Sequence, residues 1–279
     1  HDVYEGGWQT VVPHGGYPDT VSGADMGLHG DVNTIPWDCR IEEDSPKRVS
    51  VTFVGESIRT PFKVKKTLTL EADSAILQLD ETVINQSDEP QDCVWLEHIA
   101  IGPPFLSEKC RLYVPEGTRI LSDPSDTDPN SKLVPGFEGP WPNVPLKDGT
   151  TSDFSTIPPR SDRSLDMAYM TGADDGWYAI LNRDLQLGWV VNYPSEVFKY
   201  LWYWRNYAGG MGYPWYGRCF NAGLEPCTSF GNAGVTESQD NGTARRFRGN
   251  ESIKVTLFAG AFTGNAAVIG MDGKKVITS

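Results

Sequence analysis

Apolar and polar residues alternate with a period of two along most of the chain. Val49, Val51 and Phe53, for example, alternate with Ser50 and Thr52. The same alternation recurs in residues 62–71, 75–84 and 252–260. Because successive side chains of a strand point to opposite faces, this pattern predicts half-buried strands with one face in a core.

Further strands are expected wherever short apolar or aromatic runs lie between turn residues. These candidates are residues 93–101, 111–115, 177–183, 187–193, 198–204 and 217–225. Convincing apolar spacing of the i, i+3, i+4, i+7 type is missing, and the 29 glycines and 20 prolines interrupt the chain too often for long helices. The predicted fold class is all-β, and about ten or more strands indicate a large sandwich or barrel.

Residues 121–165 depart from this rhythm because they are rich in proline, aspartate and serine. Strands of the same style resume after them, so a long loop within a single domain of residues 1–279 is favoured over a domain linker. The chain has no repeat of fixed period, which argues against a propeller.

Composition narrows the function classes. A net charge of −13 argues against nucleic acids and anionic membranes as partners, and the apolar stretches are too short to span a bilayer. The five cysteines form an odd set without C-x-x-C, which is typical of free thiols in a reducing, cytoplasmic setting. These features fit a soluble protein that acts on a neutral small molecule, and leave both a monomer and a homodimer open.

Three histidines could carry chemistry. His14 lies in a Gly/Pro turn and is expected at the surface. His29 has glycines nearby on both sides, which permit close approach to a ligand, and His98 lies in a strand-like run that ends in Gly-Pro-Pro. Taken singly, His29 and His98 are as compatible with a core position as with a functional one.

Glu225 is a lone carboxylate in the apolar segment "FNAGLEPCTSFG". Apolar surroundings would raise its pKa and make it a usable base near neutrality, whereas an ion pair with Arg218 is the structural alternative. Just upstream, Trp202 and Trp204 are expected on one strand face and Tyr203 on the other. Flat aromatic rings stack on the C–H faces of sugars, although both tryptophans could instead anchor a core.

Four segments in order resemble landmarks of the aldose 1-epimerases, in the galactose mutarotase-like superfamily. They read "HGDVNTIPW", "TPFKVKKTLTLEADSAILQLDETVINQSDEP", "WLEHIAIGPPFL" and "GLEPCTSFG". The resemblance runs from about residue 6 to the end of the chain. It implies a large antiparallel β-supersandwich, strands preceding residue 1, and an open cleft for a monosaccharide or sugar derivative, with no metal or cofactor. It implies that His98 is the general acid, that Glu225 is the general base, and that His29 binds sugar oxygens.

The chain departs from the family pattern where the sugar is usually held. The expected arginine is missing before "GWQTVVPHGG"; Gln9 lies in this segment and Arg59 is a candidate substitute. Asp184 is a weak match to the substrate-binding aspartate. The expected binding set is therefore His29, Gln9, Arg59, Asp184, Trp202 and Trp204. Which sugar they would bind is not determined by the sequence.

Two other functions compete with an epimerase. One is a non-catalytic carbohydrate-binding protein on the same fold. The other is a phosphosugar mutarotase, which needs a basic cluster to hold the phosphate; only scattered candidates such as Lys65, Lys66 and Arg205 are present, so it ranks lowest. If the protein is an enzyme, we expect His98 and Glu225 to point into one pocket, with their side chains roughly 5–8 Å apart.

Overall fold

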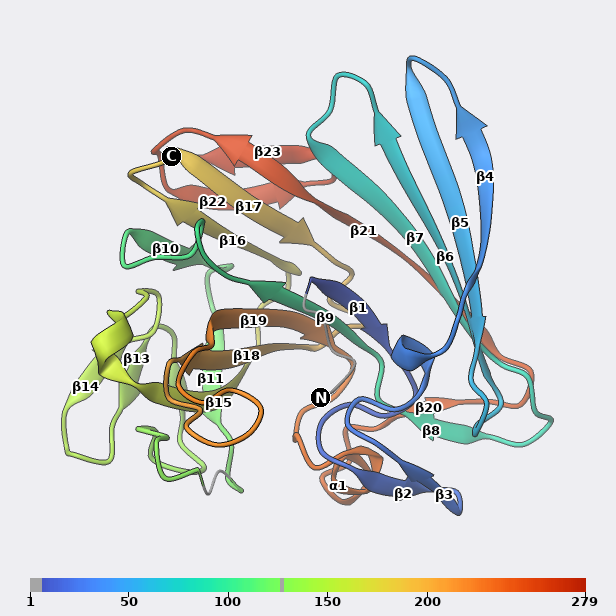
Figure 1. Ribbon diagram of the computed structural model, residues 1–279, viewed down its shortest axis with the longest axis horizontal. Helices are drawn as coiled ribbons and strands as arrows, with labels where there is room; N and C mark the ends of the chain where they lie inside the picture. Colours follow the sequence, from blue (N-terminus) through green and yellow to red (C-terminus); the bar gives the residue numbers. More distant parts are fainter. Residues whose placement is uncertain (1–6, 126–127) are drawn as a thin grey trace.

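Two large antiparallel sheets form the body of the molecule (Figure 1). The computed structural model describes residues 7–125 and 128–279. Strands account for 50% of the chain and helices for 4%, which confirms the all-β prediction.

The seven-stranded sheet carries the residues of the candidate site. Its strands, in spatial order, are β1 (Trp8–Val11), β9 (Leu96–Ile101), β19 (Phe220–Cys227), β18 (Tyr200–Tyr207), β15 (Ser164–Thr171), β11 (Arg119–Ser122) and β12 (Glu138–Pro140). The eight-stranded sheet has the order β10 (Cys110–Tyr113), β16 (Trp177–Asn182), β17 (Leu187–Asn192), β21 (Ser252–Thr263), β7 (Ile76–Asn85), β6 (Phe62–Glu71), β5 (Arg48–Glu56) and β4 (Asp38–Asp44). The strands predicted from the sequence match these elements with boundaries shifted by a few residues.

Four two-stranded pairs and three short helices complete the described structure. The pairs are β2 (Asp19–Val21) with β3 (Ala24–Met26), β8 (Gln91–Cys93) with β20 (Arg245–Phe247), β13 (Asn143–Pro145) with β14 (Thr151–Asp153), and β22 (Val268–Asp272) with β23 (Lys275–Thr278). The helices are the 3₁₀ turns η1 (Val32–Thr34) and η2 (Arg160–Asp162), and α1 (Val235–Asp240). Within these described ranges no helix is long and apolar enough to cross a membrane.

The main core lies between the two large sheets. Tyr203 and Leu224 of the first sheet and Leu79 and Leu257 of the second belong to one buried cluster, together with Trp95. Each strand of the first sheet therefore turns every second side chain toward the second sheet and the others toward the opposite face. That opposite face is where the candidate site lies.

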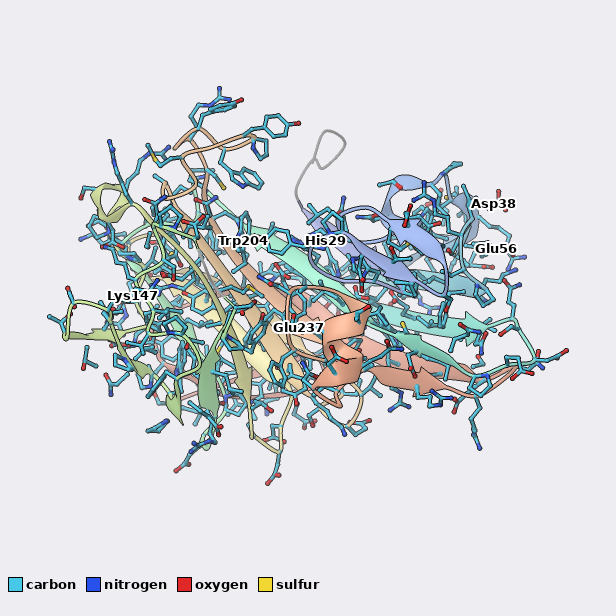
Figure 2. All side chains as sticks on the ribbon, turned by 90° about the horizontal axis from the view of Figure 1, so that it is seen from below. His29, Asp38, Glu56, Lys147, Trp204 and Glu237 are labelled. Atoms are coloured by element: carbon cyan, nitrogen blue, oxygen red, sulfur yellow. The ribbon has the colours of Figure 1, made fainter. Side chains whose placement is uncertain are left out.

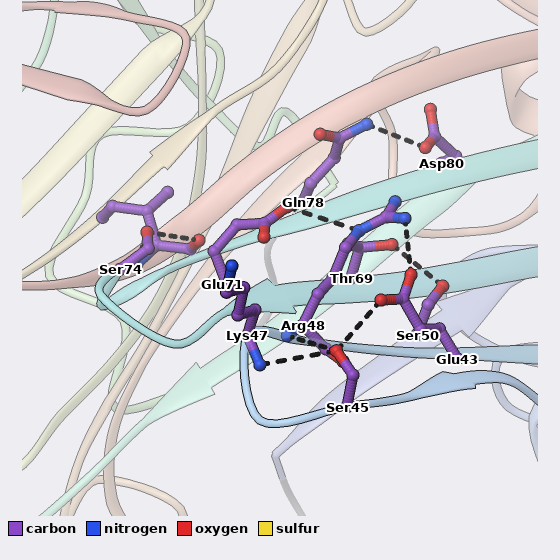
Figure 3. Close-up of polar contacts among 11 residues, drawn as sticks. Glu43, Ser45, Lys47, Arg48, Ser50, Thr69, Glu71, Ser74, Gln78 and Asp80 are labelled. Atoms are coloured by element: carbon purple, nitrogen blue, oxygen red, sulfur yellow. Dashed lines mark hydrogen bonds and ion pairs between the residues drawn. The ribbon is translucent and has the colours of Figure 1, made fainter.

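The outer ends of β4 to β7 project beyond the first sheet (Figure 1). Val49, predicted on a core face, is 42% exposed, and Ile41 and Leu70 near it are also exposed. Polar contacts hold this end together: Arg48 pairs with Glu43 and Glu71 across neighbouring strands (Figure 3). The alternation predicted the strand β5 but not its buried face, because Ser50 and Thr52 are each only 4% exposed, whereas Val51 and Phe53 are half-buried.

The segment predicted as a long loop contains short regular elements. Strands β12, β13 and β14 and the turn η2 all lie within residues 121–165, of which 126–127 fall outside the described ranges. A Cys-to-Cys bond is not formed, since all five cysteines are described and all are free thiols.

Candidate active site

The register of the first sheet brings residues from four distant segments into one row. Gln9 of β1 pairs with His98 of β9, and Glu225 of β19 pairs with Trp202 of β18. Between β19 and β9, Gly223 pairs with Ala100 and Cys227 with Leu96, so Glu225 falls opposite His98. Paired residues of neighbouring strands share a face, and this face is the one turned away from the main core.

His98 and Glu225 are in direct contact. His98 Nε2 lies 3.3 Å from Glu225 Oε1, and the two residues are only 4% and 2% exposed. Both line a cavity of about 500 Å³, a size within the usual range for small-molecule sites. The separation is shorter than the sequence-based expectation because the two residues face each other across one strand pair. Arg218, the alternative partner of Glu225, instead lies over the ring of Tyr216.

Gly223 leaves the space that the Glu225 carboxylate occupies. The two residues lie two positions apart on β19, so they share a face, and a Cβ at position 223 would lie 2.2 Å from Glu225 Oε1. Any larger residue would push the carboxylate away from His98.

Burial keeps both members of the pair uncharged. It raises the pKa of Glu225 well above its ordinary value and lowers the pKa of His98 to about 4. Burial therefore favours a form of the pair in which Glu225 is protonated and His98 is neutral. Transfer of that proton to His98 creates a carboxylate base and an imidazolium acid side by side without changing the total charge.

His29 reaches the same cavity from the loop before η1. Its ring lies edge-on to that of His98, with the centroids 4.9 Å apart. The backbone N–H of Gly16 donates to His29 Nδ1 at 3.2 Å, and burial lowers the pKa of His29. The neutral ring therefore carries its proton on Nε2 and is suited to donate to an oxygen of a ligand.

His14, predicted at the surface, is fully buried. Its Nε2 lies 2.5 Å from the carbonyl oxygen of Tyr17, and a Cβ on Gly234 would clash with its ring. The Gly/Pro turn around His14 is covered by the segment that leads into α1, which the local sequence could not reveal.

Aromatic side chains form part of the cavity wall. Trp202 and Trp204 lie on one face of β18 and Tyr203 on the other, as predicted. Trp202 is 2% exposed and donates its indole N–H to the carbonyl of Ser229, so it supports the wall from within. Trp204 is half-buried and lines the cavity from β18. His29 lines the same cavity from another segment, the loop before η1 (Figure 2).

Three residues of the expected binding set are absent from the described cavity lining. Gln9 lies beside His98 in the sheet and accepts a hydrogen bond from Asn33. Arg59 is exposed and donates to the carbonyl of Asp25, and Asp184 lies in the exposed turn between β16 and β17. A role of Gln9, Arg59 and Asp184 in sugar binding stays a prediction.

The basic residues considered for a phosphate are used elsewhere. Lys66 is buried with Glu97 and Glu81 in the main core, and Arg205 pairs with Asp166 at 3.5 Å. Lys65 extends from the opposite face of β6. Lys66 and Arg205 could be considered as phosphate ligands only because nothing in the local sequence indicates that each forms a buried ion pair.

Several lining residues lie outside the expected binding set. They are Tyr17, Asn130, Met167, Tyr213, Trp215 and Asn232, and most come from loops. Only Tyr213 and Trp215 had a signal in the sequence, since both belong to the aromatic run that ends in "GYPWYG".

A family model described as a domain of unknown function (DUF4432) matches residues 4–258. No curated protein sequence matches the chain.

Solved structures share the fold at low identity. A candidate aldose 1-epimerase from Klebsiella pneumoniae is 17% identical over 92% of this chain, with a TM-score of 0.68, and the chain spans 63% of that protein. A galactose mutarotase-like protein from Clostridium acetobutylicum is 16% identical over 92% of this chain and 79% of its own, with a TM-score of 0.59. Galactose 1-epimerase from Lactobacillus acidophilus is 11% identical over 91% and 78%, with a TM-score of 0.56. These similarities establish the galactose mutarotase-like fold.

Proposed function

We propose that this chain, which belongs to the family described as a domain of unknown function (DUF4432), interconverts the anomers of an aldose. The observation that carries the proposal is the contact between His98 and Glu225, buried at the cavity wall and 3.3 Å apart. The epimerase and mutarotase names of the structural neighbours support the same reaction class.

The reaction needs one acid and one base on the two oxygens of a single hemiacetal carbon. The Glu225 carboxylate takes the proton from the anomeric hydroxyl, and the C1–O1 double bond forms. The bond between C1 and the ring oxygen breaks, its electron pair stays on the ring oxygen, and His98 protonates that oxygen. The pair holds one proton before and after this step, so the opened aldehyde is formed without exchange with solvent.

Rotation about the C1–C2 bond then presents the other face of the aldehyde to the hydroxyl that closes the ring. His98 takes the hydroxyl proton back and Glu225 returns a proton to O1, which yields the opposite anomer. His29 donates its Nε2–H to a sugar oxygen and keeps the ring oriented during opening.

The charges at the cavity favour an uncharged sugar over a phosphosugar. Among the described lining residues there is no lysine or arginine to hold a phosphate, and the ionisable side chains besides the histidines and tyrosines are the carboxyl groups of Asp128, Asp166 and Glu225. A carbohydrate-binding protein without catalysis would use the same aromatic wall, but it gives no role to a buried acid–base contact.

The test is polarimetry of freshly dissolved aldoses with the wild-type protein and the variants Glu225→Gln and His98→Asn. We expect the wild-type protein to accelerate anomer interconversion of at least one sugar. In each variant the rate should fall by about 10²- to 10⁴-fold, the usual contribution of a general acid or base. Circular dichroism checks that both variants keep their fold. No acceleration on any aldose, or equal rates in all three proteins, would contradict the proposal.

A further inference from the structure

The loop of residues 208–219, between β18 and β19, carries exposed aromatic side chains at the mouth of the cavity. Tyr213 and Tyr216 are 61% and 58% exposed. Tyr213 and Trp215 both line the cavity. Large exposed aromatic residues grouped beside a cavity mark an interaction site more often than chance.

Backbone hydrogen bonds hold this loop in a fixed form. Ala208 N–H donates to Cys219 at its base, and Gly217 N–H donates to Gly210 above it. Gly210 is required there, because a Cβ at this position would lie 2.7 Å from the ring of Trp215. The aromatic side chains are therefore presented by an ordered loop, which lowers the entropy cost of binding to them.

A continuous series of aromatic residues connects this loop with the reactive pair. Trp204 lies directly across from Gly223, over which the Glu225 carboxylate folds. The ring of Trp215 packs on Trp204 with the centroids 5.3 Å apart, and Tyr213 lies two residues before Trp215 and contacts Tyr216. The wall that begins beside Glu225 thus continues outward to the solvent.

The cavity has more room than one sugar ring needs. A water occupies about 30 Å³ of the liquid, and the atoms of a hexose are bonded more closely than neighbouring waters, so its roughly 12 non-hydrogen atoms fill less than about 360 Å³. The cavity holds about 500 Å³. Space remains between a ring placed at His98 and Glu225 and the aromatic loop.

From these observations we infer that Tyr213 and Trp215 form a subsite for a second sugar ring, and that the substrates are reducing disaccharides. This inference rests on the proposed function, since it places the reducing ring at His98 and Glu225. The second ring stacks on the loop through its C–H face. Asn130 and Asn232, which also line the cavity, supply amide groups for its hydroxyls, which favours a sugar over a purely apolar substituent.

The test compares binding of matched sugars by isothermal titration calorimetry. Glucose is compared with cellobiose, maltose and lactose, and mannose with mannobiose, so that each pair shares its reducing ring. The proteins are wild type, Tyr213→Ala, Tyr213→Phe and the control Leu185→Ala, which truncates a side chain 55% exposed in the distant turn between β16 and β17. Anomer interconversion of the same sugars is measured separately.

We expect at least one disaccharide to bind roughly tenfold more tightly than its monosaccharide. This is the gain in affinity expected from stacking one additional ring on an aromatic side chain. Tyr213→Ala should abolish that difference while leaving monosaccharide affinity unchanged, whereas Tyr213→Phe and Leu185→Ala should preserve it. Equal affinity within every pair, equal weakening of both members by Tyr213→Ala, or no binding at all would overturn the subsite. Tight disaccharide binding without accelerated interconversion would instead overturn the proposed reaction and leave the subsite standing.

Discussion

At the scale of single residues, the site depends on one buried contact, in which His98 Nε2 lies 3.3 Å from Glu225 Oε1. Glu225 could be singled out because a carboxylate among apolar residues is costly unless it has a purpose. Its partner could not be read from its neighbours, since His98 lies 127 positions earlier and meets it only through the register of β9 and β19. The role of Gly223 was equally hidden, because it depends on where one side chain folds.

Gly223→Ala should reduce the interconversion rate at least tenfold while leaving the fold intact. The added methyl group would meet Glu225 Oε1 at 2.2 Å and displace the carboxylate from His98, and misplaced catalytic groups lose rate steeply. The control is Gly27→Ala, where the methyl group meets nothing within 4 Å. Equal activity in the two variants would show that the position of the carboxylate is unimportant.

We expect kcat/KM to fall below about pH 4, and we expect its pH profile to show no inflection near pH 6.5. Burial depresses the pKa of His98 from 6.5 to about 4, so the one-proton state of the pair persists as pH falls until His98 takes a second proton. Rates measured from pH 3.5 to 8 on an accelerated sugar check this. An inflection near 6.5 that disappears in His98→Asn would mean that His98 is not desolvated.

At the scale of elements, long alternating strands were predicted well and short ones were not. β5, β6, β7 and β21 have nine to twelve residues, enough for the period of two to stand out. Strands of three residues, such as β12, carry too few positions for any pattern and owe their form to pairing with a neighbour. The buried face of β5 was missed because Ser50 and Thr52, which are buried there, are polar residues.

Element packing also creates a buried polar cluster behind the site. Lys66 of β6 lies 3.4 Å from Glu81 of β7 and 3.2 Å from Glu97, the residue before His98. Burial and the nearby Glu97 raise the pKa of Glu81 to about 8. The ammonium of Lys66 thus lies between two buried carboxyl groups, and burial shifts Glu81 toward its protonated form.

Lys66→Met should lower the free energy of unfolding by about 3–5 kcal/mol, because it leaves a buried carboxylate without its cation. Lys63→Met, on the same strand, should cost only about 0–1 kcal/mol, since its pair with Glu56 is partly exposed to solvent. Denaturant unfolding of both variants provides the comparison. Similar losses would indicate that the cluster contributes nothing beyond an ordinary surface pair.

At the scale of the whole molecule, the fold class followed from the sequence but the cavity did not. Alternation and the frequency of turn residues indicate sheets, whereas the spatial order β1-β9-β19-β18-β15 mixes segments from both ends of the chain. Loops that contribute Tyr17, Asn130 and Tyr213 meet only because of that order. Local patterns could therefore identify His29, His98 and Glu225 as candidates but could not place the residues around them.

The most direct measurement is exchange NMR of the two anomer signals of an accelerated sugar, with wild type, Glu225→Gln, His98→Asn and the double variant. If both residues act on one hemiacetal carbon, each single variant should lose about 10²- to 10⁴-fold in exchange rate, and the double variant should lose little more than either. Exchange that stays at the wild-type rate in Glu225→Gln, with the fold intact, would contradict the assignment of this buried pair as the catalytic acid and base.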